Sequence, residues 1–94
     1  MKIKFTPTFH HKLDEVAAYV YQESKSNKFT VKYIRKLQKH IISYLSEFPK
    51  LGRPADEFGK GIRKLVHQQY SILYRIDNDY ILVITIYKEN LPSL

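Results

Sequence analysis

The sequence contains no cysteine, and no segment approaches the roughly 20 consecutive apolar residues that a membrane-spanning helix needs. Without cysteine the chain forms neither disulfides nor thiolate metal sites, which fits a reducing compartment. The first residues also lack the apolar run of a secretory signal peptide. We therefore expect a cytoplasmic protein that does not enter a membrane.

Repeats, low-complexity tracts and linkers are absent as well. At 94 residues, with 44% hydrophobic and 27% charged residues, the chain has an ordinary globular balance. This predicts one domain spanning residues 1–94. The histidines His10 and His11 are neighbours in a predicted helix, where adjacent side chains point in different directions, so they make a poor metal clamp. We expect no metal and no cofactor.

Acidic residues are few. Nine Asp and Glu face 16 Lys and Arg, which gives a formal net charge of +7. Residues 1–50 carry ten of the cations against four acids, so the positive field belongs mainly to the first half. Such a charge bears on partners rather than on fold, and it admits a nucleic acid, the ribosome, an acidic protein or an anionic membrane surface.

The first half predicts one strand and two helices. Lys2 to Phe5 alternates polar and apolar residues, as a short strand does. Thr6 before Pro7 is typical of a helix N-cap, and this helix should end near Glu23 or Ser24. A second helix should run from residues 27–30 to about residue 48. The apolar stripe of the first helix comprises Phe9, Leu13, Val16, Ala17 and Val20. That of the second helix comprises Ile34, Leu37, Ile41, Leu45 and Phe48.

The second half predicts a loop and three strands. Residues 50–61 are rich in turn formers, and strands are expected at 62–67, 70–76 and 80–87, with turns at 68–69 and 77–79. The last strand is apolar on both faces, which fits a central or covered strand better than an edge strand. The fold class is therefore α+β: an N-terminal strand, an antiparallel helical hairpin, and a three-stranded antiparallel meander (β-α-α-β-β-β), with the helices on one face of the sheet.

This order carries a family resemblance. The segments FPKLGRPADEF (48–58), GIRKLV (61–66), YSILYRI (70–76) and ILVITIYK (81–88) follow each other as in the RelE/ParE superfamily of type II toxin–antitoxin toxins. The chain most resembles the ParE branch, whose members similarly end the second helix with a P-x-L-G-R-P-like stretch. ParE members often place a histidine where Lys88 stands here, so the sequence departs from the commoner pattern.

The resemblance implies a toxin silenced by a cognate antitoxin. ParE-like members poison DNA gyrase, whereas RelE-like members cut mRNA in the ribosomal A site. Because both activities use one fold, the fold alone does not choose between them.

If the protein is a nuclease, the resemblance points to Arg63, Arg75, Tyr87 and Lys88. RelE-like nucleases carry phosphate-binding arginines on the open face of the sheet, and guanidinium pairs bidentately with phosphate. Tyr87 would stack on a base and Lys88 would meet a phosphate. The alternative is structural: ion pairs from Arg63 to Glu57 and from Arg75 to Asp77 or Asp79, with Tyr87 packed on the sheet and Lys88 solvated.

The acid–base groups of a nuclease are scarce. His67 has a suitable pKa range and should share a face with Arg63 and Leu65, although a strand-end histidine usually has no chemistry. The segment 89–94, ENLPSL, contains no Arg, His or Tyr, whereas ribosome-dependent relatives often supply catalytic residues beyond the last strand.

A cationic stripe on the second predicted helix has the clearest electrostatic pattern. It comprises Lys28, Lys32, Arg35, Lys36 and Lys39. With Arg63, these residues are our candidates for binding an anionic partner: an antitoxin segment, gyrase, or DNA held by gyrase. The alternative is a solvated outer face, which charge runs usually are.

Eight tyrosines are too many for the core of so small a chain, so some should line a partly apolar surface that binds the antitoxin. The main hypothesis is a ParE-like toxin that binds gyrase and catalyses no reaction of its own. The alternative is a ribosome-dependent mRNA endonuclease, and a third reading is a basic binding module without toxicity.

Overall fold

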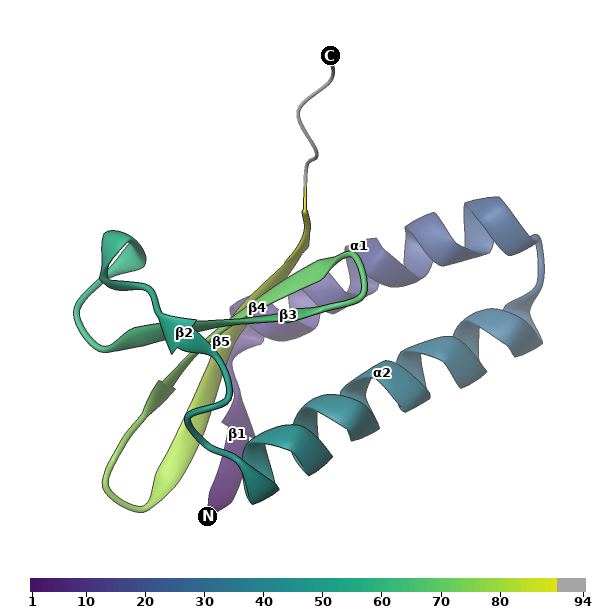
Figure 1. Ribbon diagram of the computed structural model, residues 1–94. Coiled ribbons are helices and arrows are strands. Elements are labelled where there is room, and N and C mark those ends of the chain that lie inside the picture. Colours follow the sequence, from purple (N-terminus) through teal and green to yellow (C-terminus); the bar gives the residue numbers. More distant parts are fainter. Residues whose placement is uncertain (90–94) are drawn as a thin grey trace.

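The protein folds as a helical hairpin laid on one face of a five-stranded sheet (Figure 1). The computed structural model describes residues 1–89. Its elements are β1 (Lys2–Phe5), α1 (Pro7–Ser24), α2 (Asn27–Glu47), β2 (Arg53–Pro54), the 3-10 helix η1 (Asp56–Phe58), β3 (Ile62–His67), β4 (Tyr70–Ile76) and β5 (Tyr80–Lys88). The predicted α+β order is confirmed, and residues 90–94 of the predicted tail lie outside the described part.

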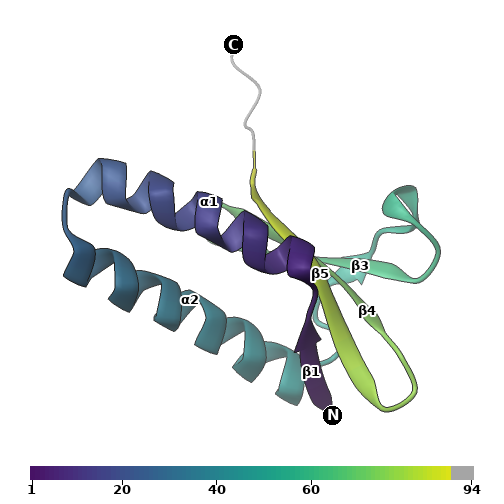
Figure 2. The same cartoon turned by 180° about the vertical axis from the view of Figure 1, so that it is seen from behind.

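The strands are ordered β1-β5-β4-β3-β2, with β1 parallel to β5 and the other pairs antiparallel. β5 is thus an interior strand between β1 and β4, as its apolar faces predict. Seen from behind, both helices lie on the same side of the sheet and their connection extends beyond it (Figure 2). Within residues 1–89, no helix combines the length and the apolarity that crossing a membrane requires.

Local capping sets the helix ends. The Thr6 hydroxyl accepts a hydrogen bond from the Phe9 backbone N–H at 3.0 Å, and Pro7 occupies the first helical position, as predicted. Lys25 ends α1 in the left-handed conformation, at φ 55°. Ser26 then caps α2 by accepting from the Phe29 N–H at 3.1 Å. The break between the helices is therefore short, and the hairpin is antiparallel.

The main core lies between the hairpin and the sheet. The predicted stripes supply it, with Phe9, Ile41 and Leu45 fully buried. Phe48 is the exception, because α2 ends at Glu47 and Phe48 becomes the C-cap residue, where its side chain is 55% exposed. The prediction that Phe48 joins the apolar stripe is wrong for this reason.

A β-bulge in the β4–β5 pair changes which face each later residue of β5 occupies. Tyr74 pairs with Val83 but Leu73 pairs with Thr85, so Ile84 is an extra residue on β5. Before the bulge, Val83 faces the helices; after it, Ile86 does so too, three residues on. Regular alternation would have put Ile86 on the opposite face.

The predicted loop 50–61 contains an edge strand that the sequence pattern missed. Arg53 and Pro54 of β2 pair with Lys64 and Arg63 of β3. Two residues that include a proline give no strand signal, and proline is tolerated only because β2 is an edge. The chain before β2 is fixed by Tyr74, whose hydroxyl donates to the Pro49 carbonyl at 2.7 Å and accepts from the Gly52 N–H at 2.9 Å.

Candidate functional site

We call the sheet surface turned away from the helices the outer face. A small second core of Ala55, Ile62 and Leu73, with Ile84 and Tyr87 packed against it, covers part of this face. Beside it lies a polar cluster made by Lys64 of β3, Ser71 of β4 and Glu89 after β5. The Lys64 Nζ lies 3.0 Å from Glu89 Oε1, and the Ser71 hydroxyl donates to Glu89 Oε2. Lys64 also lies over the Tyr87 ring, 5.9 Å from its centroid.

Within the polar cluster, the charges of Lys64 and Glu89 neutralise each other. The Ser71 hydroxyl and the Lys64 ammonium hold the pKa of Glu89 below its usual range. The hydrogen bond to Glu89 in turn raises the pKa of Lys64. Glu89 is therefore a weak proton acceptor and Lys64 a weak proton donor at neutral pH, which suits a structural ion pair better than general acid–base catalysis.

Arg63 does not lie on the outer face. It pairs with Tyr74, which belongs to the core under the helices, so the expected placement of both arginines on the open face is wrong for Arg63. Its Nε donates to the Gly52 carbonyl at 2.8 Å and its Nη2 to the Lys50 carbonyl at 3.2 Å. The expected ion pair with Glu57 is also wrong, because Glu57 binds Arg53 instead, at 2.8 Å.

Arg75 does lie on the outer face, opposite Ile62. Its guanidinium makes two bonds to the Asp77 carboxylate, at 3.2 and 3.3 Å, as the structural alternative predicted. This interaction lowers the pKa of Asp77. Because the Arg75 side chain is still 42% exposed, the pair contributes little stability and the guanidinium keeps access to solvent.

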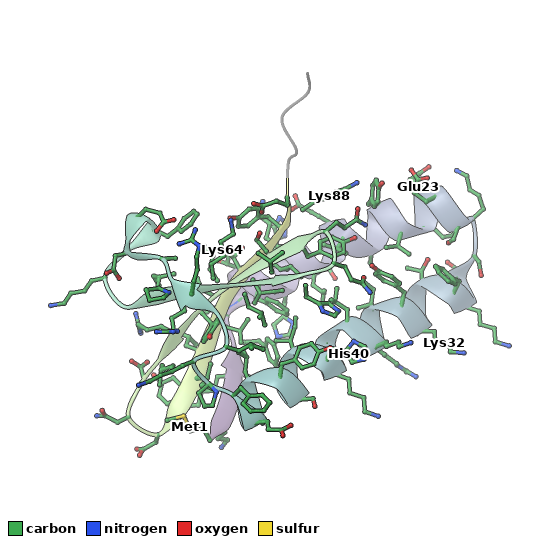
Figure 3. The ribbon with its side chains drawn as sticks, viewed as in Figure 1. Met1, Glu23, Lys32, His40, Lys64 and Lys88 are labelled. Carbon is green, nitrogen blue, oxygen red and sulfur yellow. The ribbon has the colours of Figure 1, made fainter. Side chains whose placement is uncertain are left out.

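The other two nuclease candidates are neighbours in β5, so strand alternation places them on opposite faces of the sheet. Tyr87 lies on the outer face opposite Ser71, whereas Lys88 pairs with Tyr70, a residue of the core under the helices. The Lys88 ammonium sits over the Tyr19 ring of α1, 3.8 Å from its centroid. Figure 3 shows Lys88 at the end of β5 and Lys64 on β3.

The four candidates therefore do not converge. Arg63 and Lys88 are on the helix side, and Arg75 and Tyr87 are on the outer face. Arg75 pairs with Leu82 while Tyr87 is opposite Ser71, four residues along β4 from Arg75, which is roughly 13 Å along the strand.

His67 lies on the same face as Arg63 and Leu65, as alternation predicts. Its ring packs edge-on against His40, at 5.4 Å between centroids, and against Tyr44, at 5.5 Å. Burial, and then the nearby His40, lower the pKa of His67. It is thus part of the α2–β3 contact rather than of the outer-face cluster. Across residues 1–89, no three His, Asp or Glu side chains gather as metal ligands would.

The cationic stripe of α2 is on the solvent side of the helix, as predicted. Its five members, Lys28, Lys32, Arg35, Lys36 and Lys39, are all exposed. The salt bridges found among residues 1–89 involve none of them. Arg63, the sixth candidate for anion binding, is not part of this surface because it binds the loop after α2.

The tyrosines divide between core and surface. Tyr70 and Tyr74 are fully buried, while Tyr19, Tyr21 and Tyr44 are exposed. A groove between α1 and the end of β5 is lined by Val16, Tyr19, Tyr70, Ile86 and their neighbours. The Tyr70 hydroxyl is buried without a hydrogen-bond partner among the described residues. This groove fits the predicted partly apolar, tyrosine-lined surface.

Lys64, Ser71 and Glu89 were not among the predicted site residues. Alternation marks Lys64 and Ser71 as outer-face residues, so that part of the signal was available. Glu89 follows the last strand, and its position depends on the register between β4 and β5, which no local pattern gives.

The fold and its surfaces define a small basic α+β protein with a charged helix face and an apolar groove. A model of the family described as ParE toxin of the type II toxin–antitoxin system parDE matches residues 3–90. The chain therefore belongs to the ParE toxin family, and is a toxin of the type II class.

Two solved structures support the fold. The chromosomal ParDE toxin–antitoxin system from P. aeruginosa matches with a TM-score of 0.74 and 17% identity, covering 96% of this chain and 97% of that one. The toxin–antitoxin complex RelBE2 from Mycobacterium tuberculosis matches with a TM-score of 0.67 and 19% identity, covering 94% and 96%. No curated protein sequence matches the chain.

Proposed function

We propose that this toxin arrests growth by binding DNA gyrase, without catalysing a reaction of its own. Membership of the ParE family supports this target, since the family model spans residues 3–90. The observation that carries the proposal is the dispersal of the nuclease candidates over two faces of the sheet, together with an outer-face carboxylate whose pKa is lowered. RNA cleavage needs a proton acceptor and phosphate-binding cations at one place.

The direct test is a gyrase assay. Purified toxin is incubated with gyrase, ATP and relaxed plasmid, and supercoiled product and protein-linked cleaved DNA are measured. We expect loss of supercoiling and an increase in cleaved DNA, with a type I topoisomerase unaffected as control. Normal supercoiling at a molar excess of soluble, folded toxin would refute the gyrase target.

One observation favours the second candidate, a ribosome-dependent mRNA endonuclease. Lys64, Tyr87 and Glu89 do meet on the outer face, as an ammonium, an aromatic ring and a carboxylate. On this alternative, Glu89→Gln abolishes codon-phased cuts in cellular transcripts while leaving the fold intact. Uncut transcripts in cells arrested by the wild-type toxin would eliminate the nuclease and leave the gyrase proposal standing.

We also propose that a cognate antitoxin neutralises the toxin by covering the groove between α1 and the end of β5. The exposed ring of Tyr19 and the largely apolar lining of the groove support this position. Tyr19→Glu should weaken co-purification with the antitoxin, whereas Tyr21→Glu, on a neighbouring exposed tyrosine outside this groove, should not. Equal loss with both variants would remove the groove as the binding surface.

A further inference from the structure

The exposed face of α2 is cationic along most of its length. At 100° per residue, its five cations occupy an arc of roughly 100°, centred opposite the buried arc of Leu37, Ile41 and Leu45. From Lys28 to Lys39 the cations extend about 16 Å along the axis. In Figure 3, Lys32 lies on the part of α2 that extends beyond the sheet.

This arrangement of charges destabilises α2. Lys28 and Lys32, and Lys32 and Lys36, are like charges four residues apart, which repel each other. The first turn of α2 contains no acidic residue and the last turn no basic one, and Lys28 in the first turn opposes the helix macrodipole. The only acid of α2 is Glu47 at its end. A polyanionic partner would turn this local repulsion into binding energy.

The chemistry of the face distinguishes a nucleic acid from a protein partner. The remaining residues within the arc are Ser43 and Ser46, both exposed, and no aromatic side chain lies within it. Cores of protein interfaces are depleted in lysine and enriched in aromatic residues. Protein–DNA interfaces are strongly positive, and lysine, arginine and serine side chains supply most of their phosphate contacts.

We propose that the Lys28–Lys39 face of α2 binds the phosphate backbone of duplex DNA without reading its sequence. This inference deepens the proposed function, because it assigns the face to the DNA segment that gyrase holds. Five cations over about 16 Å match the roughly five phosphates that one strand presents over the same length, at 3.4 Å each. Apart from these cations the arc holds only Ser43 and Ser46, so we expect the face to contact phosphates and not the edges of the bases.

The test measures salt dependence. Binding of the whole toxin to a fluorescein-labelled DNA duplex is followed by anisotropy over a series of KCl concentrations. If five phosphates are contacted, the affinity should fall about 500-fold between roughly 50 and 200 mM salt, and competing duplexes of other sequences should bind equally. The variant Lys28→Gln/Lys32→Gln/Lys36→Gln should reduce this fall to about 12-fold.

A charge-matched control distinguishes an effect of the α2 face from an effect of the net charge of the protein. Lys2→Gln/Lys50→Gln/Lys60→Gln removes three exposed cations from other parts of the chain and should keep the wild-type salt dependence. Circular dichroism of both variants verifies that α2 is folded. Equal losses in the two triple variants, or no binding of the wild type at low salt, would overturn the proposal. Binding to polyglutamate equal to that of the duplex would do so as well, by assigning the face to an acidic protein.

The gyrase assay separates this inference from the function on which it rests. If the α2 variant loses DNA binding but still poisons gyrase, the assignment of the face to the DNA that gyrase holds fails, while the gyrase target stands. If the wild type binds duplex DNA through α2 but leaves gyrase unaffected, the target fails and the DNA-binding face stands.

Discussion

The Tyr74 hydroxyl is the contact that joins the end of the helical hairpin to the sheet. The Tyr74 side chain is fully buried. Its hydroxyl donates to the Pro49 carbonyl and accepts from the N–H of Gly52, a residue that is buried as well. Arg63 binds the carbonyl of the same glycine, so three groups share one hydrogen-bonded network. Tyr74→Phe removes only the oxygen, and the ring still fills its place.

The expected loss of stability comes from the two backbone groups that lose their hydrogen-bond partner when the hydroxyl is removed. The Pro49 carbonyl is only part-buried and can turn to water, but the buried Gly52 N–H loses its acceptor, and an unsatisfied buried group costs about 1–3 kcal/mol. We expect a loss of about 2 kcal/mol, which for a domain of this size lowers Tm by about 8–16 °C.

Thermal unfolding followed by circular dichroism measures this loss. Tyr21→Phe is the matched control, since Tyr21 is exposed and its hydroxyl has no hydrogen bond among those found in residues 1–89. Its Tm should change by no more than about 4 °C, in keeping with a surface substitution. If Tyr74→Phe melts with the control, the Tyr74 network does not stabilise the fold and the reasoning about the loop is wrong.

Three further predictions concern the same region and the helix–sheet contact. Gly52→Ala should destabilise by about 1–3 kcal/mol in urea unfolding, because the new Cβ would lie 2.8 Å from the Lys64 carbonyl oxygen; stability equal to wild type would contradict this steric argument. Arg63→Gln should cost about 1–3 kcal/mol through its two lost carbonyl bonds, whereas Arg75→Gln, in an exposed ion pair, should cost less than about 1; the reverse order would contradict both structural roles. The pKa of His67 is lowered in the folded protein. The contribution of His67 to the free energy of unfolding is therefore fully present above the unfolded pKa of about 6.5, and it is lost as the pH falls through the folded pKa. His67→Phe should therefore make the decline in unfolding free energy between about pH 7.5 and 5.5 shallower, and an unchanged decline would assign it to other groups.

Features of the fold that depend on nearest neighbours along the chain were predictable. The Thr6 cap, the helix lengths and the buried stripes follow from propensity and from the 3.6-residue period, which are local. The cationic face of α2 belongs to the same group, because any helix over residues 27–47 places those five side chains together. The failure at Phe48 falls at the end of a helix, where local signals are weakest, and β2 was missed because two residues that include a proline give no strand signal.

The faces of the sheet were decided by tertiary structure. The bulge at Ile84 reverses the side on which Tyr87 and Lys88 lie, and its position is set by pairing between β4 and β5. The same non-local register brings Glu89 to Lys64. The sequence by itself thus determined the hairpin, the succession of helices and strands along the chain except for β2, and the charge of α2, since each depends on residues a few positions apart. Only the packed sheet decided which polar side chains meet, because that depends on strands whose register local sequence does not encode.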